Sequence, residues 1–263
     1  MASWQVNHKF SIRWRFIILS TYLLLVSNSM QGQVSVRDSV FSFSIASITG
    51  GYSLPGGDLA DRFGGNFSIG GNYFRKHRSN WLFGVQGDFL FGDRVKERDF
   101  LYSLSNSQGQ IITQNGTYGN ILLYERGWRV EARIGKILPV IGPNKNCGLV
   151  VMGGVGFLQH KIRIESQGDN IPSLEGNYVK GYDRLSNGLS ISEFIGYFNF
   201  GNRRRINFFV GLEATQAFTK SRRDFDFDTR MRDDQERNDL LFGIRAGWII
   251  PLYKKIPNAY YFD

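Results

Sequence analysis

The sequence is poor in the residues that build disulfide frameworks and metal sites. Its 263 residues include one cysteine, three histidines and six prolines. A single cysteine cannot close an intrachain disulfide, and scattered histidines do not supply the clustered ligands of a structural zinc site. We therefore expect neither a cofactor nor a metal.

Long hydrophobic runs are also scarce. The longest, Phe16–Val26, is too short for a membrane-spanning helix, which needs about 20 apolar residues. Basic residues precede it and the small polar residues 27–29 follow, which is typical of a secretory signal peptide. We predict a signal peptide over residues 1–32, cleaved within 29–33; an uncleaved anchor is the alternative.

Aromatic residues and glycine are abundant. Aromatics make up 15% of the chain, glycine contributes 31 residues, and the formal net charge is +9. So many large apolar groups exclude a disordered chain, and a mean hydropathy of -0.25 argues against a bundle of membrane helices. The modest positive charge suits anionic lipid head groups better than nucleic acid. We expect outer-membrane lipid, and no nucleic acid, as a partner.

Apolar and polar residues alternate with a period of two along most of the remaining chain. Trp81, Phe83 and Val85 share one face of a segment whose other face carries Gln86 and Asp88. The same alternation predicts eight strands, near residues 40–52, 66–75, 81–92, 120–135, 147–163, 189–200, 206–218 and 240–252. The apolar phase slips near residues 157–159, which predicts a bulge or an exit from the membrane there.

The connections between these strands alternate in length. Long ones at 53–65, 93–119, 165–188 and 220–239 alternate with shorter ones at 76–80, 138–146 and 201–205. This sorting is typical of an up-and-down membrane barrel with both termini in the periplasm. We predict an all-β fold: a closed eight-stranded antiparallel up-and-down transmembrane β-barrel over residues 33–253, followed by a periplasmic tail, 254–263. A secreted β-sandwich or a lipocalin-like barrel with apolar residues inside is the alternative.

The glycine- and aromatic-rich strands and the ending Gly243–Tyr253 resemble the small outer-membrane barrels of Bacteroidota, which include PorT-like and OmpA-like β-barrel proteins. The resemblance covers most of residues 33–253 as a pattern, without a catalytic motif. The final strand resembles the signal read by the barrel-assembly machinery, although ten residues follow it. The resemblance implies an outer-membrane location and admits a role in type IX secretion and gliding.

Charged residues fall mainly on the polar face of the predicted strands. The predicted lumen ion-pair network comprises Asp88, Glu125, Arg129, Glu131, Arg133, Glu193, Glu213 and Arg245. Mixed charges inside a narrow barrel favour mutual pairing, because an eight-stranded barrel has little interior beyond its side chains. We predict a plugged, rigid anchor. The alternative is a narrow passive channel for apolar or anionic solutes that depends on Arg129, Arg133 or Arg245.

The long connections carry residue types that are enriched in binding hot spots. The predicted partner-binding residues are Tyr102, Tyr182, Arg184, Arg222, Arg223, Phe225 and Phe227. We therefore predict a non-enzymatic membrane anchor or accessory subunit of an envelope or secretion assembly, with protein partners in the envelope.

Few residues suggest catalysis. His160 with Ser190 or Ser192 admits a third interpretation, an outer-membrane lipid hydrolase, but such a site is recognised only by its geometry. We interpret His160 as a rim histidine that contacts water and head groups. Asp58 and Asp61 lack the closely spaced oxygen ligands of a calcium loop, so we expect a turn there and no catalytic residue anywhere.

Overall fold

The computed structural model describes residues 40–168, 170–201 and 206–252. The predicted signal peptide and C-terminal tail lie outside these residues. The strands are β1 (Phe43–Gly57), β2 (Asn66–Lys76), β3 (Trp81–Gly92), β4 (Asn120–Leu138), β5 (Gly148–Gln167), β6 (Ser186–Phe200), β7 (Asn207–Ser221) and β8 (Glu236–Leu252). The helices are α2 (Asp58–Arg62) and the 3₁₀ turns η1 (Asp99–Leu104), η2 (Pro172–Leu174) and η3 (Tyr178–Gly181). Among the described residues, no helix combines the length and apolar character needed to cross a membrane.

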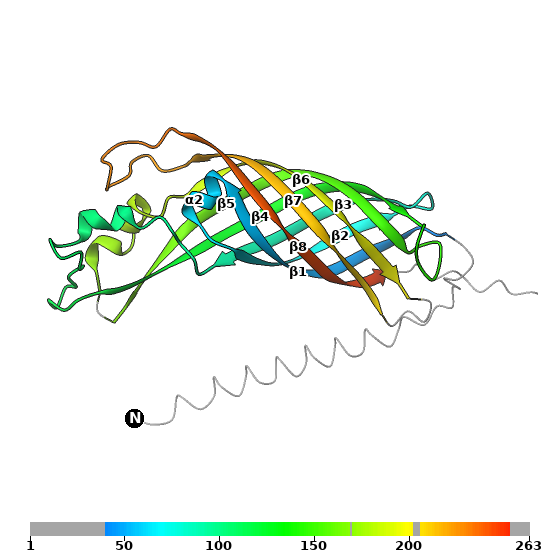
Figure 1. Cartoon of the computed structure of the whole chain (residues 1–263), viewed down its shortest axis with the longest axis horizontal. Helices are drawn as coiled ribbons and strands as arrows, with labels where there is room; N and C mark the ends of the chain where they lie inside the picture. The colour runs from blue at the N-terminus through cyan, green and yellow to red at the C-terminus, as the bar shows by residue number, and fades with distance from the viewer. Residues whose placement is uncertain (1–39, 169, 202–205, 253–263) are drawn as a thin grey trace, which may run out of the picture. The chain divides into compact units, whose positions relative to one another are not determined.

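Every strand pairs antiparallel with its sequence neighbours, and β8 pairs with β1, so the sheet closes on itself (Figure 1). At the seam, Gly50 of β1 lies opposite Ala246 of β8. Closure leaves no free sheet edge, and a strand that crosses lipid must pair all its backbone groups because no water is available to them. The predicted eight-stranded up-and-down barrel is confirmed.

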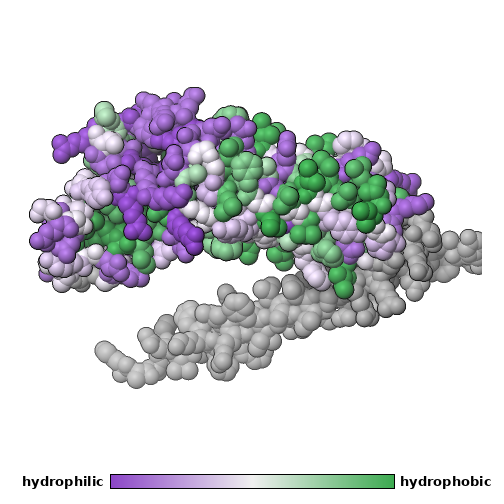
Figure 2. Space-filling model, in the orientation of Figure 1, coloured by the Kyte–Doolittle hydropathy of each residue, from purple (hydrophilic) through white to green (hydrophobic). Residues whose placement is uncertain are grey.

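The outer surface of the barrel is apolar. Side chains such as Val130, Ile134 and Ile195 are exposed on the outside, whereas their sequence neighbours point inward. On the face seen in Figure 2, hydrophobic residues gather over the strands and hydrophilic residues gather at the end with the long connections. An apolar belt of this kind is unfavourable in water and favourable in lipid. The faces are therefore arranged as predicted for a transmembrane barrel.

Strand β5 shows no bulge. It pairs with β4 residue by residue from Leu149 to Gln167, so the predicted bulge at residues 157–159 is wrong. The apolar phase looks shifted in the sequence because Leu158 and Ile162 point into the barrel, where they join an internal apolar cluster. The strand also continues past the predicted end at Arg163.

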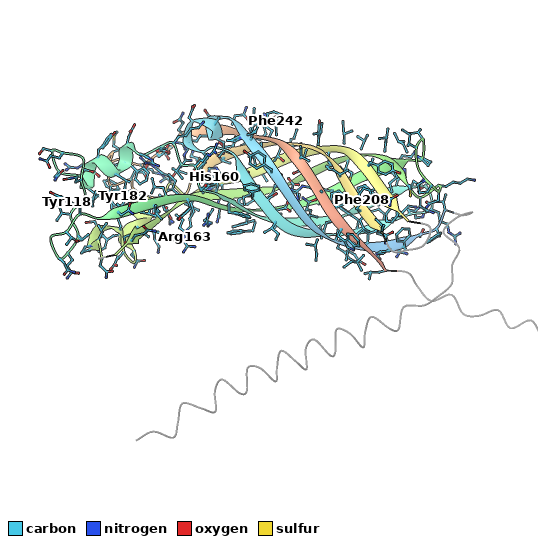
Figure 3. The ribbon with its side chains drawn as sticks, turned by 60° about the horizontal axis from the view of Figure 1, so that its bottom comes forward. Tyr118, His160, Arg163, Tyr182, Phe208 and Phe242 are labelled. Carbon is cyan, nitrogen blue, oxygen red and sulfur yellow. The ribbon has the colours of Figure 1, made fainter. Side chains whose placement is uncertain are left out.

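The connections sort to the two ends of the barrel (Figure 1). We call one end the loop end; it carries residues 58–65, 93–119, 168–185 (of which 169 is not described) and 222–235. The other, the turn end, carries residues 77–80, 139–147 and 201–206, of which 202–205 are not described. In Figure 3, Tyr118 and Tyr182 mark the loop end, and Phe208 lies toward the turn end. All the long connections therefore meet in one place.

Two glycines provide a matched test of this packing. A Cβ added at Gly84 would lie 2.0 Å from the carbonyl oxygen of Tyr73, whereas one added at Gly153 would meet nothing within 4 Å. We expect Gly84→Ala to lower the free energy of unfolding by about 1–3 kcal/mol, the usual cost of overpacking. Urea titration of the folded barrel in lipid vesicles measures the change. Gly153→Ala is the control, and an equal effect of both substitutions would contradict this account.

Candidate functional site

The middle of the barrel interior holds a balanced layer of buried charges. It consists of three carboxylates and three guanidiniums: Asp88, Glu131, Glu213, Arg129, Arg133 and Arg245. Glu213 contacts all three arginines. Its Oε2 lies 2.8 Å from Nη2 of Arg129 and 2.8 Å from Nη2 of Arg245, and its Oε1 accepts a short hydrogen bond from Arg133. The opposite charges satisfy one another, which a buried charge requires.

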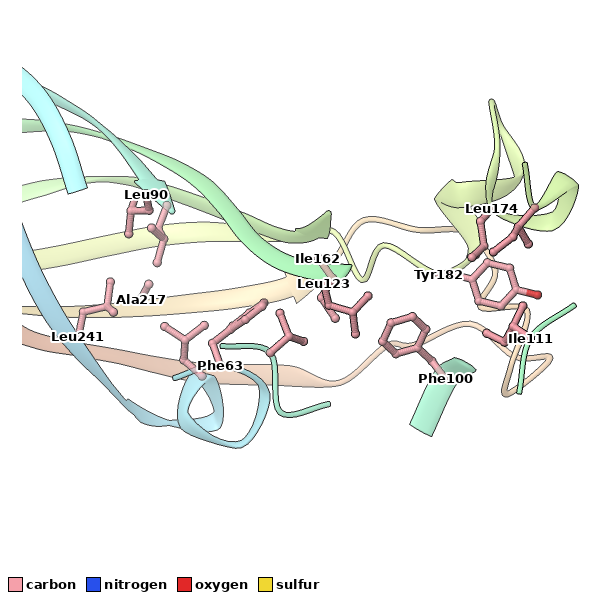
Figure 4. Packing of buried hydrophobic residues seen from close by; sticks show 14 residues of the cluster. Phe63, Leu90, Phe100, Ile111, Leu123, Ile162, Leu174, Tyr182, Ala217 and Leu241 are labelled. Atoms are coloured by element: carbon pink, nitrogen blue, oxygen red, sulfur yellow. The ribbon is translucent and has the colours of Figure 1, made fainter. Parts of the chain in front are cut away.

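Apolar side chains fill the interior on both sides of this layer. Toward the loop end, the cluster in Figure 4 runs from Leu90 and Leu241 inside the barrel to Phe100 and Tyr182 in the connections. Toward the turn end, Phe198 stacks on Phe209 with ring centroids 5.0 Å apart. The ion-pair layer is thus flanked by apolar side chains at both ends. Side chains occupy the lumen above, within and below it.

Two of the predicted lumen residues lie outside the ion-pair layer. Glu125 is buried and accepts hydrogen bonds from Nδ2 of Asn66 at 3.1 Å, without an ion pair among the described residues. Glu193 corrects the prediction, because its side chain is exposed on the outer surface. The inward position next to it is taken by Phe194, so the phase of β6 turns Glu193 toward lipid.

His160 is not at a watery rim. It is buried inside the barrel, where its Nε2 lies 2.9 Å from Oδ2 of Asp239 and its ring packs edge-on against Phe63. Ser192 donates to Glu131 at 3.0 Å instead. In the described structure neither Ser192 nor Ser190 hydrogen-bonds to His160, so the geometry of a Ser–His hydrolase is not formed.

A metal site also lacks support in the described residues. They contain no group of three or more His, Cys, Asp or Glu side chains placed to hold an ion. Asp58 opens helix α2, and its Oδ2 accepts a hydrogen bond from the backbone N–H of Asn238 at 2.6 Å. Its carboxylate thus joins the first long connection to the start of β8.

Arg184 joins the four connections of the loop end. Its guanidinium contacts Glu97 at 3.1 Å, Asp226 at 2.5 Å and Asp228 at 2.6 Å, and its carbonyl oxygen accepts a hydrogen bond from Nη2 of Arg62 at 3.1 Å. Arg62 ends α2, Glu97 lies between β3 and β4, and the two aspartates lie between β7 and β8. We call these five residues the loop clamp. Arg184 has a φ of 50°, a left-handed conformation that a non-glycine residue adopts only when its surroundings hold it there.

Electrostatics stabilise the loop clamp. Burial by itself lowers the pKa of Arg184, but Asp226, Glu97 and Asp228 more than offset it and raise that pKa above its ordinary value. Burial raises the pKa of Asp226, against the opposing effect of Arg184. The guanidinium therefore stays charged at every physiological pH. Acidification neutralises Asp226 at a higher pH than it would an ordinary aspartate.

Several predicted partner-binding residues instead hold the loops to one another. Tyr182 is buried and packs against Phe227, with ring centroids 5.5 Å apart, so most of its ring contacts other residues of the loop end. The guanidinium of Arg184 is engaged in the ion pairs of the loop clamp. Arg223 makes a short ion pair with Asp183, and Nε of Arg222 donates to Asn187 at 2.5 Å. Intramolecular contacts therefore use these polar groups.

Other predicted residues remain available at the loop end. Tyr102, Phe225 and Phe227 are 68%, 45% and 38% exposed. The backbone N–H of Phe227 donates to the carbonyl oxygen of Gly181 at 3.1 Å, which joins the last two long connections. These connections form an open pocket of about 410 Å³, which we call the aromatic pocket; it is lined by Pro172, Ser173, Tyr178, Tyr182 and Phe227.

Sequence reasoning did not place Pro172 or Ser173 in a site. Both belong to η2, which begins at Pro172 within a long connection of irregular pattern. The abundance of aromatics in the long connections was the only sequence signal for the pocket. Its volume falls in the range of ligand pockets, and aromatic walls suit an apolar side chain of a partner.

The described chain is thus an eight-stranded transmembrane β-barrel with a filled interior and a clamped loop end.

No protein-family model matches the sequence, and no curated protein is significantly similar to it. Among solved structures, Ail, the attachment invasion locus protein of Yersinia pestis, is 12% identical with a TM-score of 0.38, covering 79% of this chain and 99% of its own. Ail in complex with the heparin analogue sucrose octasulfate gives 12% identity, the same coverages and a TM-score of 0.36. Neisserial surface protein A is 11% identical with a TM-score of 0.36, covering 77% of this chain and 95% of its own. Similarities this distant carry no argument about function.

The charged layer predicts a strong effect of removing one carboxylate. Glu213→Gln leaves three buried guanidiniums against two carboxylates, so we expect the free energy of unfolding to fall by about 3–5 kcal/mol. Urea unfolding in vesicles measures the loss. Glu236→Gln is the control, since that carboxylate is exposed at the start of β8 and makes no ion pair among the described residues. A loss no larger than that of the control would contradict the role of the layer.

The loop clamp predicts a local effect. Arg184→Ala removes all three ion pairs, so we expect a protease added outside vesicles to cut residues 93–119 and 222–235 roughly tenfold faster, because cleavage tracks the population of the open form. The barrel itself should remain folded. Arg163→Ala, which removes only an exposed pair with Glu165, is the control. Unchanged cleavage in the Arg184 variant would show that other contacts hold the loops.

Proposed function

We propose that this protein is a non-enzymatic outer-membrane barrel that serves as an anchor or accessory subunit of an envelope assembly. One observation carries the proposal: a barrel filled with side chains holds a clamped loop end, and this end exposes the aromatic pocket. A filled barrel offers little to transport. Its long connections are what it presents to other molecules.

A protein partner fits this surface better than a small polar solute. Tyr178 and Phe227 offer large rigid apolar area, and fixing them in advance reduces the entropy lost on binding. The loop clamp supplies that rigidity, because Arg184 ties together connections that are distant in sequence. An apolar or aromatic side chain of the partner would occupy the pocket.

The competing functions have weaker support. A channel needs an open path, but Arg129, Arg133 and Arg245 all point into contacts with carboxylates. A hydrolase needs a nucleophile that hydrogen-bonds to His160, and in the described structure His160 bonds to Asp239 while Ser192 bonds to Glu131. The absence of an enzymatic role is part of this proposal.

Location and pathway also belong to the proposal. The apolar belt and the sorting of long and short connections support the outer membrane, with the loop end outside the cell and the turn end in the periplasm. A role in type IX secretion or gliding rests only on the sequence resemblance to Bacteroidota barrels. It stays a prediction.

The filled interior predicts that the barrel does not conduct ions. Purified protein inserted in planar bilayers should show no steady conductance above the lipid background, because side chains occupy the lumen. Urea-unfolded protein added in the same way is the control for leakage caused by insertion. Stable, stepwise channels that depend on Arg129 would overturn the anchor and favour the channel.

The aromatic pocket predicts which residues capture the partner. Affinity purification from native membranes should recover a stoichiometric partner, and Phe227→Ala or Tyr178→Ala should weaken its retention at least about tenfold, as expected for a hot spot. Tyr118→Ala is the control, since Tyr118 is exposed at the loop end but does not line the pocket. Equal retention by all variants would place the partner elsewhere.

A further inference from the structure

A carboxylate lies at the middle of the lipid-facing surface. In the middle of β6 the outward positions are Leu189, Ile191, Glu193, Ile195 and Tyr197, so Glu193 is the central one and has apolar neighbours on its own strand. It makes no side-chain hydrogen bond or ion pair within the described structure. An ionisable group facing lipid is unfavourable and is usually retained for a specific contact.

The residues on either side of Glu193 have small side chains. Its register partners are Gly153 on β5 and Ala214 on β7, two of the smallest residues. A Cβ added at Gly153 would meet nothing within 4 Å, so the glycine leaves open space beside the carboxylate instead of accommodating a neighbour. Small residues at a membrane surface let another backbone approach closely.

A hydrogen-bond donor lies next to the acceptor on the same surface. Gln216 points outward from β7, two residues beyond Ala214, which places its Cα roughly 7–8 Å from that of Glu193. Its Nε2 donates to Oδ1 of Asn238 at 3.0 Å, and an amide nitrogen carries a second N–H. The patch therefore holds a carboxylate and an amide donor side by side. We call Glu193, Gly153, Ala214 and Gln216 the β6–β7 patch.

We propose that the β6–β7 patch is an interface with a second copy of this chain. Two copies in one membrane are related by a two-fold axis along the membrane normal, which keeps every residue at its own depth. The axis brings Glu193 of each copy beside Gln216 of the other, so one contact is made twice. The small side chains at Gly153 and Ala214 allow the two copies to approach closely. A two-fold interface must be self-complementary, and a patch that contains both acceptor and donor meets this requirement.

Cross-linking tests the position of the interface. Full-length protein in lipid vesicles carries Ala214→Cys in the patch or Val85→Cys on β3, and is then oxidised; the native Cys147 is buried and serves as background. We expect covalent dimers only with Ala214→Cys, since a disulfide needs Cα atoms within about 7 Å. Monomers from both variants, or equal cross-linking of both, would overturn the proposal.

Two substitutions separate the interface from folding. Glu193→Leu should weaken association, measured by energy transfer between labelled copies in vesicles, roughly tenfold, because two symmetry-related polar contacts are lost. The same variant should resist urea at least as well as the parent, since it removes a charge from lipid. Gly153→Leu should also block association by filling the hollow. Gly87→Leu, an outward glycine on β3 whose Cβ would meet only Val130 at 4.0 Å, should not.

The outcome also distinguishes another kind of partner. If purified protein stays monomeric in vesicles while Ala214→Cys cross-links to a different chain in native membranes, the patch binds another membrane protein and the proposal of self-association fails. The proposed role of the loop end is independent of this result, because the aromatic pocket and the β6–β7 patch lie on different elements.

Discussion

The pairing of β8 with β1 is the constraint on which the rest of this structure depends. Strands in lipid have no water to satisfy their backbone groups, so the sheet must close, and closure with eight strands leaves an interior only wide enough for side chains. That narrow space explains the internal layers. Charged groups such as Arg129 must find opposite charges there, and aromatic rings such as Phe198 and Phe209 fill what remains.

The charged layer and the strand register support one another. A shift of one residue in β4 would turn Arg129, Glu131 and Arg133 toward lipid and bring Trp128 and Val130 inside. Because Glu213 on β7 contacts Arg129 and Arg133 on β4, the layer links two strands that do not pair directly. The ion pairs therefore specify this arrangement against its alternatives, in addition to any stability that they contribute.

At the loop end a comparable role falls to Arg184. It brings long connections to a common point and holds them over an apolar cluster that continues into the barrel. Irregular connections gain order in this way without strands of their own. The proposed binding surface thus depends on the loop clamp, whose Asp226 and Asp228 flank Phe227 of the aromatic pocket. The lipid-facing β6–β7 patch is a second, separate surface on the same scaffold.

The sequence by itself determined the fold class. The period of two and the alternating connection lengths can be read directly from the chain, and strands with this pattern must close into a barrel when they cross lipid. It also identified most of the charged layer, since Asp88, Arg129 and Arg133 alternate with aromatic or aliphatic neighbours. Tertiary structure alone decided the rest. The outward position of Glu193 follows from the phase of β6, in which Phe194 packs inside, and the burial of His160 follows from the apolar cluster at the loop end. Whether Tyr182 and Arg184 contact a partner or other loop residues depends on how the long connections fold together. Contacts between residues so far apart in sequence produce no periodic pattern in the sequence.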